Sequence, residues 1–146
     1  MGSILIVNGA DFSKVALDKV EISNTINEEV ALSRIERKQG SLDELGNYQS
    51  STSVNTVTDV FDLSVVKDKI ISLKVTARVG TTEGNPAMSF MDENYNVLGV
   101  AFPSKGVAEV IDNEIVDIIA GTRYVNVVAN IVYVEPSLSA IVETLL

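Results

Sequence analysis

Residues 69–79 read KIISLKVTARV, and this stretch indicates the fold class of the chain. From Ile71 to Val79 an apolar side chain occupies every second position, and polar side chains fill the positions between them. A period of two is typical of a β-strand that buries one face and exposes the other to water. We therefore predict a strand over residues 69–79 whose apolar face lies against a hydrophobic core.

Further short strands are expected on both sides of this one. Turn-forming residues separate several apolar runs, and we predict strands over residues 54–63, 87–91, 97–102, 107–111, 115–119 and 124–134. Segment 41–53 is polar and reads as a loop, and no helical pattern interrupts the series between Gly40 and Val134. Many short strands joined by turns favour an all-β fold, either an antiparallel sandwich or a barrel.

The first part of the chain has a different character. Residues 4–7 (ILIV) form a short apolar run that reads as extended. Thr25 and Glu28 have the spacing of a capping box, which predicts a short helix that ends before Gly40. Because such a helix is too short to be stable alone, we treat residues 1–38 as an N-terminal segment that needs a partner surface.

The last ten residues also differ from the predicted strands. Beyond Pro136, apolar residues recur at helix-like spacing, chiefly Leu138, Ile141 and Leu145. This spacing predicts a short C-terminal helix or apolar tail over residues 137–146 and leaves residues 39–136 as the sandwich domain. An apolar stripe must pack on its own domain or on another chain, because exposing it to water is costly.

The composition excludes most catalytic chemistry. The 146 residues include no His, Cys or Trp, which removes Ser-His-Asp triads, thiol nucleophiles and the His and Cys ligands of zinc sites. We therefore expect a protein that is not an enzyme and that uses no metal and no cofactor. A glycosidase that works with two carboxylates is the remaining catalytic alternative, and Asp59 with Asp62 is one pair that lies close in sequence.

The charge and the N-terminus exclude other classes. Eleven Lys and Arg against twenty Asp and Glu give a net charge of −9, which repels a phosphate backbone, so we expect no nucleic-acid partner. The apolar run at residues 4–7 follows no basic segment and is too short for a signal sequence or a membrane span. We expect neither a signal peptide nor membrane insertion.

Two loop tyrosines are candidates for binding a sugar. Aromatic rings on loops can stack on sugar rings, and Tyr48 and Tyr95 both fall in predicted loops. Asp92 and Asn94 lie in the same segment as Tyr95, DENYN at residues 92–96, and complete this weak set of glycan-binding candidates. The segment departs from the calcium-loop pattern of an EF-hand, so we read it as a turn.

Three stretches resemble a family of viral proteins. Residues 8–16 (NGADFSKVA) look like the N-terminal segment of small virion proteins of tailed phages that infect gut Bacteroidales, including crAss-like phages. Residues 89–99 (SFMDENYNVLG) are similar to a strand–turn–strand unit in jelly-roll modules of those proteins and of carbohydrate-binding modules. Residues 120–127 (AGTRYVNV) resemble the late turn and strand of the same modules.

The resemblance implies a jelly-roll-like β-sandwich that serves as a head fibre, capsid accessory or tail-associated protein on the outside of the virion, after synthesis in the host cytoplasm. The N-terminal segment would dock on other virion proteins by strand addition, through Ile4, Leu5, Ile6, Val7, Phe12 and Val15. A homo-oligomer, trimer or dimer, would form through Leu138, Ile141 and Leu145. The sandwich would serve assembly or adhesion to the host surface. The chief alternative is a carbohydrate-binding module that recognises a cell-surface glycan.

Overall fold

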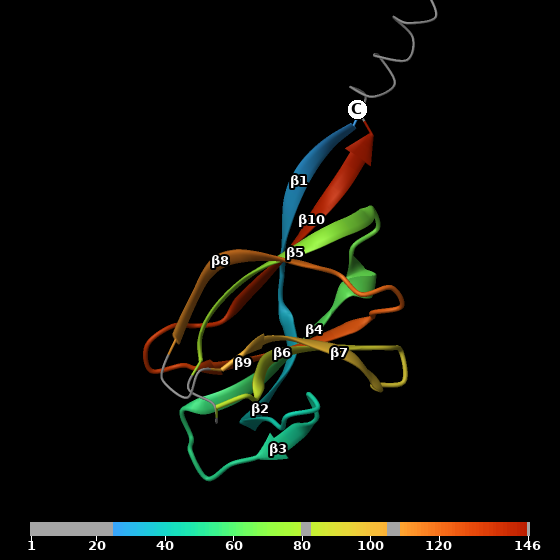
Figure 1. Cartoon of the computed structure of the whole chain (residues 1–146). Coiled ribbons are helices and arrows are strands. Elements are labelled where there is room, and N and C mark those ends of the chain that lie inside the picture. Colours follow the sequence, from blue (N-terminus) through green and yellow to red (C-terminus); the bar gives the residue numbers. More distant parts are fainter. Residues whose placement is uncertain (1–24, 80–82, 105–108, 146) are drawn as a thin grey trace, which may run out of the picture.

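The computed structural model describes residues 25–79, 83–104 and 109–145, and they form two antiparallel β-sheets packed face to face (Figure 1). The four-stranded sheet has the order β1 (Thr25–Leu32), β10 (Ser137–Leu145), β5 (Lys69–Val79) and β8 (Glu109–Asp117). The six-stranded sheet has the order β3 (Tyr48–Ser50), β2 (Arg34–Leu42), β4 (Thr56–Asp62), β9 (Tyr124–Asn130), β6 (Pro86–Met91) and β7 (Val97–Pro103). A short 3-10 helix, η1 (Leu63–Val65), follows β4.

The strand order is that of a jelly roll. The chain crosses between the sheets at each step from β4 to β6 and again from β7 to β10, while β6 and β7 form a hairpin. Sheet β1-β10-β5-β8 therefore faces β4-β9-β6-β7, the double-sheet arrangement of an eight-stranded jelly roll. Strands β2 and β3 widen the second sheet at its β4 edge. The predicted all-β, antiparallel sandwich is confirmed.

The core lies between the two sheets and follows the period-two pattern. Its members come from η1 and from the inner faces of β4, β5, β6, β8, β9 and β10, and the largest include Phe61, Leu73, Met88, Phe90 and Leu138. The predicted strand 69–79 matches β5 in full, with Leu73, Val75 and Ala77 buried. Ile71 departs from the prediction, because a bulge in the pairing with β10 places Ile70, opposite Val142, toward the core instead.

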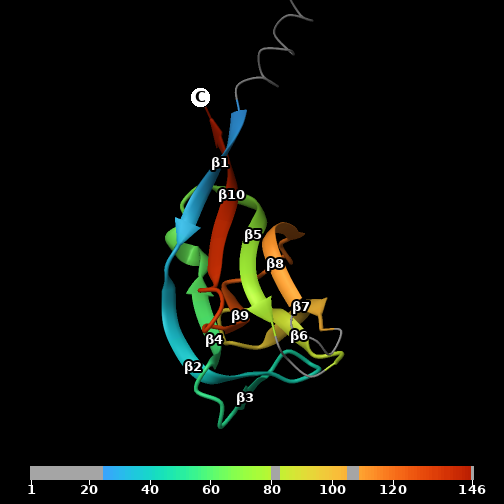
Figure 2. The same cartoon turned by 90° about the vertical axis from the view of Figure 1, so that its left-hand side faces the viewer.

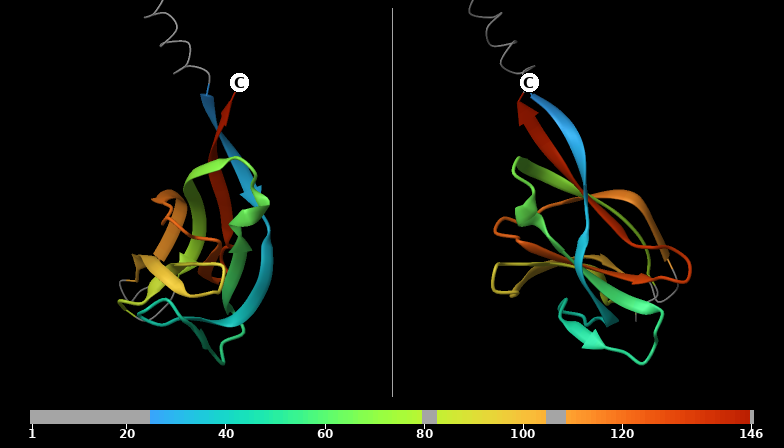
Figure 3. Two further views of the ribbon diagram at one scale, coloured as in Figure 1. Left: turned by 90° about the vertical axis from the view of Figure 1, so that its right-hand side faces the viewer. Right: turned by 180° about the vertical axis from the view of Figure 1, so that it is seen from behind.

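The predicted N-terminal helix is wrong. Residues 25–32 form β1, which pairs with β10 along its whole length, and residues 34–42 form β2 in the other sheet. The capping-box spacing is a local signal, whereas the strands are set by pairing with segments distant in the sequence, β1 with β10 and β2 with β4. The proposed boundary between residues 38 and 39 falls inside β2, so residues 25–38 belong to the sandwich. Figure 3 shows β1 and β2 as one long run down the side of the molecule.

The predicted C-terminal helix is also wrong. Residues 137–145 form β10, which lies between β1 and β5 in the four-stranded sheet. Leu138, Ala140 and Val142 are buried at every second position, as in a strand. The apolar residues of this segment are thus compatible with a strand as well as with a helix. The pairing partners on both sides decide between the two.

Two further predictions need correction. Segments 107–111 and 115–119 are predicted as two separate strands, but residues 109–117 form the single strand β8. A bulge accommodates the turn-like residues between them: the backbone N–H of Asn113 donates to Thr76 Oγ1 at 2.9 Å, and the register with β5 shifts at this point. The segment expected to be a loop contains the end of β2 and all of β3.

The two ends of the sandwich differ. The start of β1 lies beside the end of β10, where Thr25 pairs with Leu145. Figures 1 and 2 show this pair of strand ends at one extreme of the molecule and β3 at the other. The chain therefore enters the sandwich at the end that lies farthest from β3.

Candidate functional site

The outer face of the six-stranded sheet contains a pocket of about 160 Å³ between β3 and the β6–β7 turn. Val60 on β4 pairs with Asn126 on β9, which pairs in turn with Ser89 on β6. The neighbouring residues Phe61 and Val125 point into the core, so this row faces away from it. Tyr48 and Tyr95 both line the pocket.

The floor of the pocket is apolar with one polar group. Val60, Met91 and Tyr124 form a small buried cluster, and Val97 packs against it. Asn126 is only 4% exposed, and its Nδ2 donates to Ser89 Oγ at 3.1 Å. Its Oδ1 is buried and has no hydrogen-bond partner among the described residues. A buried acceptor without a partner is costly, and a donor that reached this oxygen would offset that cost.

One wall is the Tyr95 side chain, which the β6–β7 turn presents. The Asp92 carboxylate accepts from the backbone N–H groups of Asn94 and Asn96 at 2.8 and 2.9 Å. Tyr95 has a φ of 66°, a left-handed conformation. Its ring stacks on Tyr124 with the centroids 4.2 Å apart. The pKa of Tyr95 is raised, first by a hydrogen bond with the Tyr124 side chain.

The opposite wall is the Tyr48 side chain on β3. Tyr48 pairs with Leu42 of β2, and its hydroxyl donates to the Gln39 carbonyl oxygen. Gly40 makes room for the ring, since a Cβ there would lie 2.9 Å from Tyr48 Cε1 and 2.1 Å from the Gln49 carbonyl oxygen. Lys38 Nζ lies 4.9 Å from the ring centroid. These contacts hold the tyrosine in one orientation.

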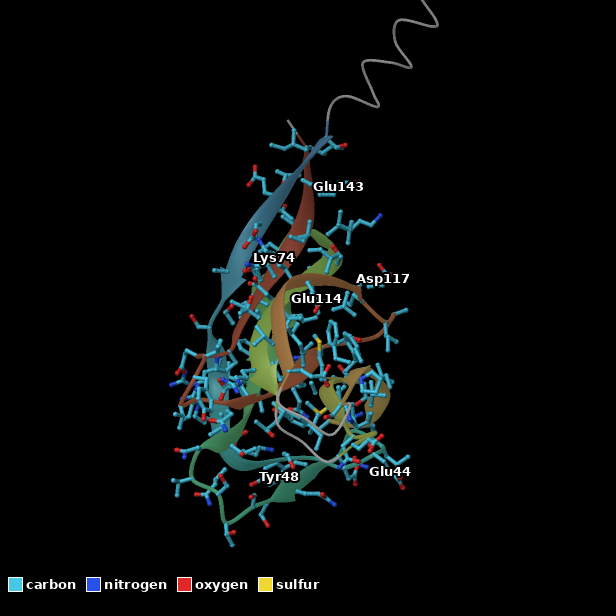
Figure 4. The ribbon with its side chains drawn as sticks, turned by 60° about the vertical axis from the view of Figure 1, so that its left-hand side comes forward. Glu44, Tyr48, Lys74, Glu114, Asp117 and Glu143 are labelled. Atoms are coloured by element: carbon cyan, nitrogen blue, oxygen red, sulfur yellow. The ribbon has the colours of Figure 1, made fainter. Side chains whose placement is uncertain are left out.

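The loop between β2 and β3 closes a third side. Asp43 Oδ1 accepts from the backbone N–H groups of Leu45 and Asn47 at 2.9 Å, which shapes a tight turn. Gly46 lies so close to β7 that a Cβ would be 2.6 Å from Val100 Cγ1. Figure 4 shows Tyr48 and Glu44 at the end of the molecule away from Glu143. The loop thus covers part of the outer sheet face and gives the pocket its depth.

The sequence candidates separate into two groups. Tyr48 and Tyr95, 36% and 54% exposed, come together in the pocket although 47 positions separate them in the chain. Asp92 and Asn94 do not line it, because the Asp92 carboxylate is engaged within its own turn. These hydrogen bonds, chiefly that from the Asn96 backbone, lower the pKa of Asp92.

The sequence candidates do not include Lys38 and Asn126, which also line the pocket. Lys38 was assigned to a helical segment, which concealed its place on a sheet face. Asn126 is the polar residue in the middle of the apolar strand YVNVVAN. A lone amide inside a buried strand is a usable signal, because it must find a partner or serve a ligand.

The residues predicted to dock on other proteins differ in where they lie. Ile4, Leu5, Ile6, Val7, Phe12 and Val15 lie outside the described residues. Leu138 is buried in the core of its own chain, which corrects its assignment to an interface between subunits. Ile141 is half-buried, whereas Leu145 at the end of β10 is 79% exposed.

The Asp59 and Asp62 carboxylates have structural partners. Arg37 donates to both oxygens of Asp59, at 2.7 and 2.8 Å, and Asp59 is fully buried. Asp62 caps η1 by accepting from the Ser64 N–H at 2.9 Å. Burial alone would raise the pKa of Asp62, but the Ser64 hydrogen bonds and the Arg123 charge outweigh it and lower the pKa. Asp59 is therefore bound to Arg37 inside the protein, and the lowered pKa of Asp62 is the opposite of what the general acid of a glycosidase requires.

The described residues contain neither a metal-binding cluster nor a membrane-spanning helix. They hold no group of three acidic side chains placed to bind a metal ion. Residues 25–79, 83–104 and 109–145 also contain no helix with the length and apolar character needed to cross a membrane. Comparison of the chain with protein-family models, with curated proteins and with solved structures finds no match.

Proposed function

We propose that this protein is a non-catalytic β-sandwich module that recognises a saccharide in the Tyr48–Tyr95 pocket. The observation that carries the proposal is the convergence of two exposed aromatic rings on one pocket with the unpartnered Oδ1 of Asn126. A sugar ring has apolar C–H faces and hydroxyl groups at its edge. It therefore requires aromatic surface together with a few fixed polar groups, which is the composition of this pocket.

The size of the pocket limits what it can hold. Its volume of about 160 Å³ is below the roughly 300–1,000 Å³ of pockets that enclose drug-sized ligands. One sugar ring is therefore the unit that enters, and the rest of a glycan would extend over the protein surface. Such a site binds weakly as a single copy, so adhesion through it would depend on several copies acting together.

A glycan array tests this proposal. We expect the intact chain, displayed in many copies on beads, to bind a subset of glycans, and the Tyr95→Ala variant to lose that binding. Tyr133→Ala is the matched control, because Tyr133 is 60% exposed and packs on Arg78 away from the pocket. Absence of any binding by the intact chain, or equal loss in both variants, would count against the proposal.

A second proposal concerns where the module acts: on the outside of a phage particle, as a head fibre or capsid accessory protein that forms a dimer or trimer. Its support is the sequence resemblance and one feature of the fold. The chain enters β1 at the end of the sandwich opposite β3 (Figure 1). Anchoring through residues 1–24 would therefore leave the Tyr48 end directed outward.

Deletion of residues 1–22 tests the virion proposal. The truncated protein keeps every described strand, so we expect it to fold with an unchanged melting temperature. We expect it to be absent from purified particles when it replaces the intact chain during infection. Incorporation at the normal level would contradict the docking role, and it would leave the proposed saccharide site untouched.

A further inference from the structure

The charge of the pocket is set by Lys38. It is the one charged side chain among the residues that line the pocket, and its Nζ lies over the Tyr48 ring at 4.9 Å from the centroid. Within the described parts of the chain, no carboxylate oxygen lies within 4.0 Å of this ammonium group. Its neighbour Arg37, by contrast, is paired with Asp59.

The Asn126 amide sets a second requirement. Its Nδ2 is already engaged with Ser89, while its buried Oδ1 accepts nothing. A ligand that offers only acceptors, such as a simple inorganic anion, would place oxygen against oxygen at this point. The group that meets Asn126 must therefore be a donor, such as a hydroxyl.

These two requirements together narrow the ligand. We propose that the pocket selects a sugar acid of the hexuronic type, whose carboxylate is bound by Lys38 and whose ring hydroxyl donates to Asn126. This inference rests on the proposed function and names the class of saccharide. A neutral sugar satisfies Asn126 but leaves Lys38 unpaired, and a bare carboxylate satisfies Lys38 but leaves Asn126 unpaired.

Glu36 places a negative charge near the pocket. It precedes Lys38 by two residues on β2 and therefore shares its sheet face. Its negative charge reaches Tyr95, where it contributes to the raised pKa of the phenol. The Arg123 charge acts on Tyr95 in the opposite direction, so the orientation rests on Lys38, whose Nζ lies over the Tyr48 ring. The acid group of the ligand therefore belongs on the Tyr48 side. The ring of the sugar then lies between the two tyrosines, above Asn126.

The test uses matched pairs of methyl glycosides: glucoside and glucuronide, galactoside and galacturonide, mannoside and mannuronide. Each pair differs only at C6, and binding to the full chain is followed by titration in NMR. We expect the acidic member of at least one pair to bind about fivefold more tightly at low salt, as a half-exposed ion pair provides. Raising the salt concentration should reduce the preference.

Variants at Lys38 separate this inference from the function on which it rests. In Lys38→Gln the ratio of the affinities for the acidic and the neutral member should fall to about one, whatever the absolute affinities become, and Lys38→Arg should retain the preference. Equal binding of both members by the intact chain, or an unchanged preference in Lys38→Gln, would overturn the inference and leave saccharide binding in place. Failure of every glycoside to bind would overturn both. Acetate serves as a further probe, and binding of acetate as tight as that of the uronide would show that no sugar ring is recognised.

Discussion

The ring of Tyr95 lies parallel to the ring of Tyr124, with centroids 4.2 Å apart and planes inclined by 10°. Tyr124 is buried and opens β9, whereas Tyr95 is exposed on the β6–β7 turn. The stack therefore ties a surface side chain to the sheet beneath it and occupies one of its two faces. Tyr95 nevertheless stays 54% exposed and lines the pocket.

The stack predicts unequal costs for its two members. Tyr124→Ala should lower the free energy of unfolding by about 3 kcal/mol, because it removes a buried ring and leaves a cavity. Tyr95→Ala should cost about 1 kcal/mol, since mainly the ring–ring contact is lost. Urea unfolding of both variants checks this order. Equal costs would mean that Tyr95 carries more of the packing than its exposure indicates.

The buried ion pair between β2 and β4 predicts a larger electrostatic effect. Arg37→Ala leaves the fully buried Asp59 without its partner and should cost about 3 kcal/mol. Arg34→Ala is the matched control, because Arg34 forms an exposed pair with Glu135 and should cost less than about 1 kcal/mol. Thermal or urea unfolding measures both, and an indistinguishable pair of values would contradict the role given to Asp59.

The position of Tyr48 in the pocket wall is predicted to depend on Gly40. Its φ is +144°, and a Cβ would lie 2.1 Å from the Gln49 carbonyl oxygen, so Gly40→Ala must break the β2–β3 pairing and displace Tyr48. Gly84→Ala is the control: its φ is +87°, but no atom lies within 4 Å of the added Cβ. Backbone strain alone should cost the control about 1 kcal/mol. We expect saccharide binding to be lost in Gly40→Ala and kept in Gly84→Ala. If Gly40→Ala still binds saccharide, Tyr48 is not part of the binding site.

The lowered pKa of Asp92 predicts a pH-dependent turn. A carboxyl group with a depressed pKa in the folded state stabilises the protein above the unfolded pKa of about 3.9, and this contribution is lost as the pH falls through the folded pKa. The melting temperature of Asp92→Ala should therefore lie below that of the intact chain at pH 6, and the difference should shrink below about pH 4. A difference that stays constant down to pH 2 would show that the carboxylate does not hold the turn.

The sequence predicts the body of the fold well because burial imposes a period of two on one-sided strands. The match of residues 69–79 to β5 and the clear alternation of buried residues in it follow from this. The same reasoning fails for the first and the last strand of the sandwich, β1 and β10. Residues 25–32 and 137–145 are read as helical because their apolar spacing also fits a helix, and only their pairing with each other and with β5 resolves the ambiguity.

The candidate site is predicted in part for a similar reason. Tyr48 and Tyr95 are identifiable because aromatic residues in polar segments stand out. Their convergence is not identifiable, since it depends on the six-stranded sheet and on the loop that folds back over β7. Lys38 and Asn126 cannot be identified as pocket residues from the sequence, because their role depends on the face of the sheet on which they lie.

Mapping of amide chemical shifts in ¹⁵N-labelled protein shows whether the Tyr48–Tyr95 pocket binds a sugar ring, as we propose. Titration with a panel of monosaccharide glycosides should shift the signals of Lys38, Asn47, Tyr48, Tyr95 and Asn126, which line the pocket. Tyr95→Ala should abolish these shifts, whereas Tyr133→Ala should leave them unchanged. Shifts that map to another surface, or no shift at the highest sugar concentration, would contradict saccharide binding in this pocket.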